Sequence, residues 1–129
     1  MNTRFANRFL ALCMLCLAAA AQAHHSTANF DRNQTVTITG TVTYFSFTNP
    51  HSFFDIDVVD EKSAKVVPHK VFAAGRVLLA RYDWKPTDLK AGDRITVSGY
   101  PDRKDPNFMY LTRIVFASGK VWERTQIPD

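Results

Sequence analysis

The sequence predicts a mainly β protein, built as a small five-stranded Greek-key barrel with one short helix between the third and fourth strands. Three observations lead to this fold class. Apolar and polar residues alternate with a period of two in several segments. One segment in the middle of the chain loses that alternation and contains good helix formers. Clusters of turn-forming Gly, Pro, Asn and Asp separate the segments.

Residues 35–47 form the first predicted strand. Val36, Ile38 and Val42 alternate with threonines, and β-branched residues with a period of two are typical of a strand that buries one face. Gly40 interrupts this run and indicates a bulge or a sharp bend. A long, bent first strand of this kind can take part in both sheets of a barrel.

The remaining elements follow after a turn at Asn49-Pro50. They are a second and a third strand, a helix with no internal breaker, two more strands and a short final segment, at residues 53–59, 65–73, 76–82, 94–99, 109–116 and 121–122. Three strands, a helix and two strands is the order of an OB-fold, a five-stranded Greek-key barrel. An open β-sandwich is the competing interpretation, although a sandwich would not need the helix.

The first 23 residues are predicted to be a cleavable signal peptide. Arg4 and Arg8 give a positive start, residues 9–20 are an apolar run, and residues 21–23 (Ala-Gln-Ala) form a small-x-small cleavage site. The run is shorter than the roughly 20 apolar residues that span a bilayer, and no second run of that kind follows. We therefore expect a periplasmic or secreted protein with no membrane span after cleavage.

Cleavage changes the composition of the working protein. Cys13 and Cys16 leave with the signal, so the processed chain has neither a disulfide nor a thiol. Sixteen basic residues become 14 against 12 acidic ones, a net charge of about +2. That balance argues against a nucleic-acid partner, which would require a basic stripe. The predicted parts are the signal peptide, a lead-in, one OB-like barrel domain and a tail, at residues 1–23, 24–34, 35–125 and 126–129.

Three motifs in a fixed order suggest a family. They are His-His-Ser at residues 24–26, Phe-Thr-Asn-Pro-His-Ser at 47–52, and Trp84 followed by Leu-Lys-Ala-Gly-Asp-Arg-Ile-Thr-Val-Ser-Gly-Tyr-Pro at 89–101. Together they resemble the bacterial family called domain of unknown function 6152, over essentially the whole processed chain. The resemblance implies a secreted OB-like domain and no established activity.

The chain departs from that family's pattern around the third strand. Where the family has a Trp and, three residues on, a Glu, this sequence has His69 and Phe72. Gly75-Arg76 stands where the family has Ser-Pro at the start of the helix. If the family uses that Glu as a ligand or catalytic group, this member lacks it, and it has a histidine nearby instead.

Four histidines survive cleavage and are the candidate metal ligands. His24 would carry a free α-amine beside its imidazole, and these two nitrogens can close a chelate ring. A third nitrogen from His25 or His51 would complete a site suited to Cu(II), with His69 as the weakest candidate. By chemical analogy alone, the arrangement resembles the histidine brace of copper monooxygenases and periplasmic copper carriers.

Each histidine also has a simpler interpretation. The His24-His25 pair can be a disordered tail, and His51 can form a hydrogen bond within its own turn. His69 shares a strand face with Val67 and Val71, as a half-buried structural histidine would. Copper is therefore the alternative hypothesis rather than the first one.

Other chemistry finds little support in the sequence. It shows neither a Ser/His/Asp signature nor a Gly-rich phosphate loop, and no cysteine nucleophile survives cleavage. Asp55 and Asp57 share a strand face, but outward acids on a half-buried strand are usually only solvated, and a calcium loop needs a Gly-assisted turn. An enzyme is not the expected outcome.

Consecutive aromatic residues indicate a binding surface. The two members of Tyr44-Phe45, or of Phe53-Phe54, cannot both point inward on a regular strand. One of each pair is therefore exposed, covered by the helix or the N-terminal segment, or free to contact a partner. OB barrels bind ligands on the face of strands two and three. The first hypothesis is thus a non-catalytic binding module for a protein or glycan, with Phe45, Phe53 and Tyr100 as contact candidates. Ordinary core packing with scattered surface aromatics is the simpler alternative.

Overall fold

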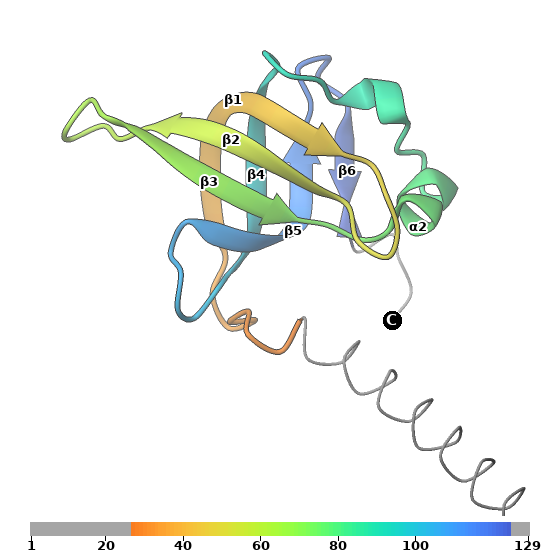
Figure 1. Cartoon of the computed structure of the whole chain (residues 1–129), viewed down its shortest axis with the longest axis horizontal. Coiled ribbons are helices and arrows are strands. Elements are labelled where there is room, and N and C mark those ends of the chain that lie inside the picture. The colour runs from red at the N-terminus through yellow and green to blue at the C-terminus, as the bar shows by residue number, and fades with distance from the viewer. Residues whose placement is uncertain (1–26, 125–129) are drawn as a thin grey trace, which may run out of the picture.

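The computed structural model describes residues 27–124, and its strands confirm the predicted fold class (Figure 1). The elements are β1 (Val36–Ser46), β2 (Phe53–Val59), β3 (Val66–Phe72), α2 (Arg76–Arg81), η1 (Pro86–Asp88), β4 (Arg94–Pro101), β5 (Phe108–Val115) and β6 (Val121–Glu123). Within the stretch that the structure describes, neither helix is long and apolar enough to cross a membrane.

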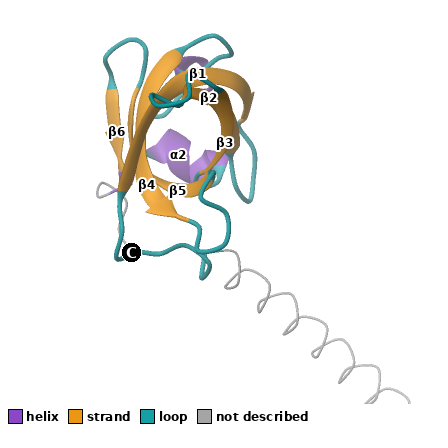
Figure 2. Ribbon diagram, turned by 90° about the vertical axis from the view of Figure 1, so that its left-hand side faces the viewer, coloured by secondary structure: helices purple, strands orange, loops and turns teal. Residues whose placement is uncertain are grey.

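The barrel closes through the pairing of β3 with β5. The sheet order is β3-β2-β1-β4-β5-β6, and Lys70 to Phe72 of β3 run parallel to Phe108 to Tyr110 of β5. All other strand pairs are antiparallel. This is the topology of the OB-fold. Figure 2 shows the ring of strands, with α2 seen through it. The short final segment of the sequence forms β6, which extends the sheet beyond β5.

Strand β1 bends because it pairs with two strands in turn, with β4 along its first half and with β2 along its second half. Gly40 lies where the partners change, and a Cβ atom there would be 2.6 Å from the backbone oxygen of Asp57. Only glycine permits so close an approach. The bend predicted at Gly40 is present, but the irregularity in register lies further on, between Val42 and Tyr44.

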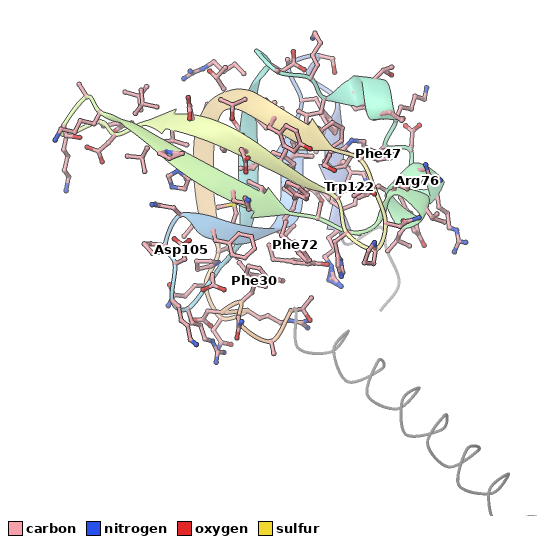
Figure 3. The ribbon with its side chains drawn as sticks, in the orientation of Figure 1. Phe30, Phe47, Phe72, Arg76, Asp105 and Trp122 are labelled. Carbon is pink, nitrogen blue, oxygen red and sulfur yellow. The ribbon has the colours of Figure 1, made fainter. Side chains whose placement is uncertain are left out.

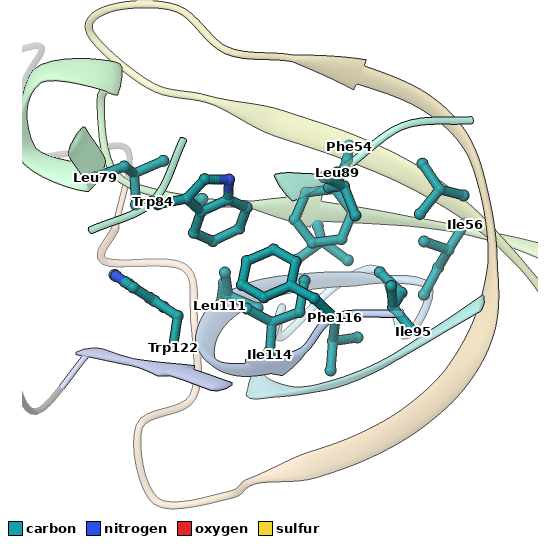
Figure 4. Close-up of a cluster of buried hydrophobic side chains, with 14 of the residues drawn as sticks. Phe54, Ile56, Leu79, Trp84, Leu89, Ile95, Leu111, Ile114, Phe116 and Trp122 are labelled. Carbon is teal, nitrogen blue, oxygen red and sulfur yellow. The ribbon is translucent and has the colours of Figure 1, made fainter. Parts of the chain in front are cut away.

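The core fills the barrel with aromatic and aliphatic side chains (Figure 4). Alternation identified inward positions correctly, because Val42, Phe54 and Ile56 are buried. Trp84 and Trp122 close the cluster, with ring centroids 5.4 Å apart. The other buried members are Val71, Ala73, Leu79, Leu89, Ile95, Val97, Met109, Leu111, Ile114 and Phe116.

Hydrogen bonds tie the turn before β2 to the start of α2. The backbone N–H of Arg76 donates to the carbonyl of Thr48, with 2.9 Å between N and O. The N–H of Val77 donates to the side-chain oxygen of Asn49 at 3.4 Å. Ser52 is fully buried, and its hydroxyl donates to the Thr48 carbonyl at 3.1 Å. This turn is the Phe-Thr-Asn-Pro-His-Ser motif, and several of its polar groups thus have structural roles.

Candidate functional site

Outward-pointing side chains of neighbouring strands form rows across the barrel surface, since cross-strand partners share a face of the sheet. One row runs from Phe53 on β2 to Phe72 on β3 and Tyr110 on β5. The adjacent row runs from Tyr44 on β1 through Asp55 on β2 to Lys70 on β3 and Phe108 on β5. We call the β1–β3 part of these rows the outer face, consisting of Tyr44, Phe53, Asp55, Lys70 and Phe72.

Tyr44 and Phe53 form an open aromatic pair on this face. Their ring centroids are 5.7 Å apart with an interplanar angle of 37°. The Tyr44 side chain is 52% exposed, and Phe53 is half-buried. The prediction that one member of each consecutive aromatic pair faces outward is therefore confirmed.

Charged groups flank this aromatic pair. The Lys70 ammonium lies 5.3 Å from the centroid of the Phe53 ring and 3.9 Å from a carboxylate oxygen of Asp55. Asp57 lies further along β2 on the same side, opposite Thr41 of β1. The outer face thus combines aromatic rings, a cation and carboxylates, a set that can stack on a ring and exchange hydrogen bonds with hydroxyl or amide groups.

A segment of the lead-in covers the β3–β5 end of the rows. Phe30 is only 3% exposed, and its ring lies 6.1 Å from that of Phe72, 5.1 Å from Phe108 and 5.6 Å from Tyr110. Figure 3 shows Phe30 beside Phe72. Backbone hydrogen bonds hold this segment in place; in one, the N–H of Asp31 donates to the carbonyl of the last residue of β4 at 2.8 Å.

A groove of about 350 Å³ adjoins the outer face, between the turn before β2 and α2. The His51 ring packs on Phe72, with 4.5 Å between their centroids, and forms part of the groove wall. The guanidinium of Arg124 lies over the ring of Tyr110, which also lines the groove, 5.3 Å from its centroid. The full lining is Asn49, Pro50, His51, Ala74, Gly75, Val77, Leu78, Arg81 and Tyr110.

The structure does not bring together the predicted metal ligands that it describes. His24 and His25 lie outside the described residues. His69 pairs with buried Ile56 and so faces inward, opposite to the side on which His51 contacts Phe72. Its Nδ1 is 3.1 Å from the carbonyl oxygen of Val67. Between residues 27 and 124, no group of three His, Cys, Asp or Glu side chains is placed to hold a metal ion.

The three predicted contact residues take different positions. Phe53 lies on the outer face, whereas Phe45 points inward against Phe54 and Trp84, with ring centroids 6.3 and 6.2 Å away. Tyr100, on β4, is the cross-strand partner of Tyr110; it therefore continues the first row beyond β5, where it is half-buried. Sequence reasoning did not single out Lys70 or the lead-in aromatic as part of this surface.

Comparison with known protein families identifies the family of this chain. A sequence model of the family described as "Family of unknown function (DUF6152)" matches residues 11–108. The chain belongs to this family. The resemblance noted from the three motifs is thereby confirmed.

Solved structures with a similar course of the chain have low sequence identity. Mitochondrial single-stranded DNA binding protein Rim1 from S. cerevisiae is 10% identical to this DUF6152 chain. The matched region covers 64% of this chain and 92% of Rim1, with a TM-score of 0.47. The ZRD-deleted mutant of TiaS in complex with agmatine is 19% identical, covering 75% and 28%, with a TM-score of 0.49. The SSB domain of a Synechococcus sp. protein is 17% identical, covering 70% and 98%, with a TM-score of 0.38. No curated protein matches the chain. The fold assignment rests on the strand pairing described above.

Proposed function

We propose that this DUF6152 protein is a non-catalytic binding module, exported to the periplasm or secreted, that holds a glycan or protein partner on its outer face. The observation that carries the proposal is the open pair of Tyr44 and Phe53, which stands beside Lys70 and Asp55. An aromatic ring that is half exposed on a rigid strand is suited to stacking against an apolar surface of a ligand.

The position of the outer face in the fold supports the proposal. OB barrels use the face of their second and third strands to bind extended ligands, and Phe53 and Lys70 lie on those strands. Nucleic acid is not the ligand that we propose. A phosphate backbone along the face would pass the carboxylates of Asp55 and Asp57, and the processed chain carries a net charge of only about +2.

Export follows from the predicted signal peptide at residues 1–23. We expect the protein from the periplasm or the culture medium to begin at His24. N-terminal sequencing of the protein recovered from each cell fraction tests this part. Recovery of the unprocessed chain from the cytoplasm would contradict it.

The binding test compares two exposed side chains. Wild type, Tyr44→Ala and Val121→Ala are applied to a glycan array and used as bait against periplasmic extract. Val121 is 43% exposed on β6, away from the outer face, and serves as the control. We expect the ligand to be lost with Tyr44→Ala and kept with Val121→Ala. A ligand retained equally by all three proteins would contradict the assignment of the face.

A copper site is the second candidate, and one observation favours it. Phe30 and His51 both pack on Phe72, at centroid distances of 6.1 and 4.5 Å. Thr27 to Phe30 form a turn in which the N–H of Phe30 donates to the carbonyl of Thr27 at 3.4 Å, and the three residue steps from His24 to Thr27 span at most about 10 Å. The processed chain would therefore begin close to the segment that shares Phe72 with His51, whereas His69 faces the other way.

Cu(II) titration followed by electron paramagnetic resonance tests the copper candidate. The samples are the processed protein beginning at His24, the same protein with one added residue before His24, and His51→Ala. Tight one-to-one binding that weakens in both altered proteins supports a site made from the N-terminus and His51. Weak binding that is identical in all three samples would eliminate it.

A further inference from the structure

We propose that the groove beside α2 binds the acidic group of a saccharide, a carboxylate or a phosphate, while the rest of that saccharide lies on Tyr44 and Phe53. The saccharide part of this inference rests on the proposed function. The anion site rests on the groove itself, and the two parts are tested separately.

The charge of the groove is the first argument. Arg81 and His51 line it, Arg124 lies over its Tyr110 wall, and the lining contains no acidic side chain. Arg81 forms no ion pair with any residue between 27 and 124. A guanidinium presents a planar fork of donors that matches a carboxylate or a phosphate.

A second cavity on the same molecule provides a contrast. It measures about 650 Å³ and is lined by Arg94 and Lys62 together with Asp60 and Glu61. Two basic and two acidic side chains balance there, so this larger space offers an anion no net attraction. The groove beside α2 is smaller, and Arg81, the charged side chain in its lining, is basic.

The walls of the groove are fixed by the contact between the turn and α2. The side-chain oxygen of Asn49 accepts the N–H of Val77, which leaves the Asn49 amide N–H groups as donors. Gly75 lies so close to Pro50 that a Cβ atom would be 2.5 Å from its carbonyl oxygen. A glycine at this position therefore allows the helix to approach the turn. The Asn49 amide is thus held in place before any ligand arrives, which lowers the cost of binding.

The groove is continuous with the outer face. His51 contacts Phe72, and Phe72 is the cross-strand partner of Phe53. From position 51, in the turn before β2, to position 55 on β2, an extended chain advances about 13 Å. That length suits an oligosaccharide of a few rings with its acidic group at one end. It also keeps the acidic group away from Asp55 and Asp57.

The anion site is tested with simple anions. Sodium phosphate and sodium acetate are titrated into ¹⁵N-labelled protein at constant ionic strength, with sodium chloride as the reference salt. We expect saturable shifts of the amide signals of His51, Val77 and Arg81 in the low millimolar range. Arg81→Gln should abolish them, and Arg94→Gln, the same change in the charge-balanced cavity, should leave them intact. Shifts that are absent, or equal in chloride, would overturn the anion site.

The saccharide part is tested on a glycan array that carries neutral, uronic-acid and phosphorylated glycans. We expect binding only to acidic glycans, lost with Arg81→Gln and kept with Arg94→Gln, and the array shows whether the carboxylate or the phosphate is preferred. Binding to neutral glycans that ignores Arg81→Gln would overturn this inference while supporting the proposed function. If no glycan binds but phosphate or acetate does, the saccharide assignment is wrong and the anion site stands.

Discussion

Aromatic side chains occupy both sides of the same strands in this barrel, and the two sides differ in what covers them. Inside, Phe54 and Trp84 are fully buried within one cluster. Outside, Phe53 is half-buried and Tyr44 is 52% exposed, with a lysine and a carboxylate beside them. Phe53 and Phe54 are neighbours in sequence, so a single step along β2 separates a half-buried ring on the outer face from a fully buried one in the core. We infer that the inner set determines stability and the outer set determines binding.

The lead-in covers only part of the aromatic side chains on the outer side of the barrel. Phe30 buries the β3–β5 end of the aromatic rows, whereas the β1–β2 end carrying Tyr44 stays open. The molecule covers an apolar surface where β3 and β5 close the barrel and leaves one open over β1 and β2. Outward-facing aromatic residues are thus not exposed everywhere on this barrel. Tyr44 is exposed because no segment between residues 27 and 124 covers its end of the outer face.

The largest expected effect is on the inner side. Trp84→Ala removes a fully buried indole that contacts Phe116 and Trp122, and it should lower the free energy of unfolding by about 3–5 kcal/mol. Tyr44→Ala on the outer face should change it by less than about 0.5 kcal/mol. Urea denaturation of both variants measures the difference. Equal losses of unfolding free energy in the two variants would contradict the claim that the inner side chains contribute more to stability than the outer ones.

Removal of the lead-in aromatic should have an intermediate effect. Phe30→Ala exposes the rings of Phe72, Phe108 and Tyr110 and should cost about 2–3 kcal/mol, close to the value of burying one phenyl group. Amide exchange should also accelerate at Asp31, because its hydrogen bond to β4 is lost. If amide exchange at Asp31 and the free energy of unfolding are both unchanged, the lead-in does not protect the pairing of β3 with β5 that closes the barrel.

Two lysines that form ion pairs, Lys120 and Lys70, allow the same comparison with charged side chains. Lys120 lies 2.8 Å from Asp88 and 3.3 Å from Asp83 and is 28% exposed, whereas Lys70 is 53% exposed and 3.9 Å from Asp55. We expect Lys120→Met to cost about 1 kcal/mol and Lys70→Met less than about 0.5 kcal/mol in urea denaturation. A larger loss with Lys70→Met would mean that the outer face contributes to stability.

The smallest expected effect is a dependence on pH. Burial alone would raise the pKa of Asp88, but the hydrogen bond from Lys120 and the backbone N–H of Lys85 outweigh it and lower that pKa below its ordinary value of 3.8. A lowered pKa stabilises the folded state above the ordinary value, and this contribution is lost as the pH falls through the folded-state pKa. Wild type should therefore lose its advantage over Lys120→Met as the pH falls from neutrality to below the ordinary value of 3.8. A constant advantage in thermal unfolding across that range would contradict the assignment.

Local sequence patterns were sufficient to predict the architecture. Alternation identified the strands and the inward positions such as Ile56, and the loss of alternation after residue 75 identified α2. The order of elements then indicated the barrel. The positions of the strands and of the helix depend mainly on residues that are close together in the chain. A single sequence is therefore enough to predict them.

The composition of the outer face depends on contacts between residues far apart in the chain, and alternation does not show those. Phe72 and Tyr110 meet only because β3 and β5 close the barrel in one particular register. Phe30 is a lone aromatic in a polar segment, and no period predicts where it docks. Phe45 was assigned to partner contact, but the irregularity after Val42 reverses part of β1, so that Tyr44 faces outward and Phe45 inward.

The most direct test of the central claim measures binding and stability on the same variant. The dissociation constant of the strongest glycan or protein ligand from the screens is determined for wild type, Tyr44→Ala and Val121→Ala, with Tm recorded for each. We predict that Tyr44→Ala binds at least about tenfold more weakly, a loss of roughly 1.4 kcal/mol, at an unchanged Tm, and that Val121→Ala matches wild type. Equal affinity of Tyr44→Ala and wild type would contradict the claim that the outer face is the binding surface.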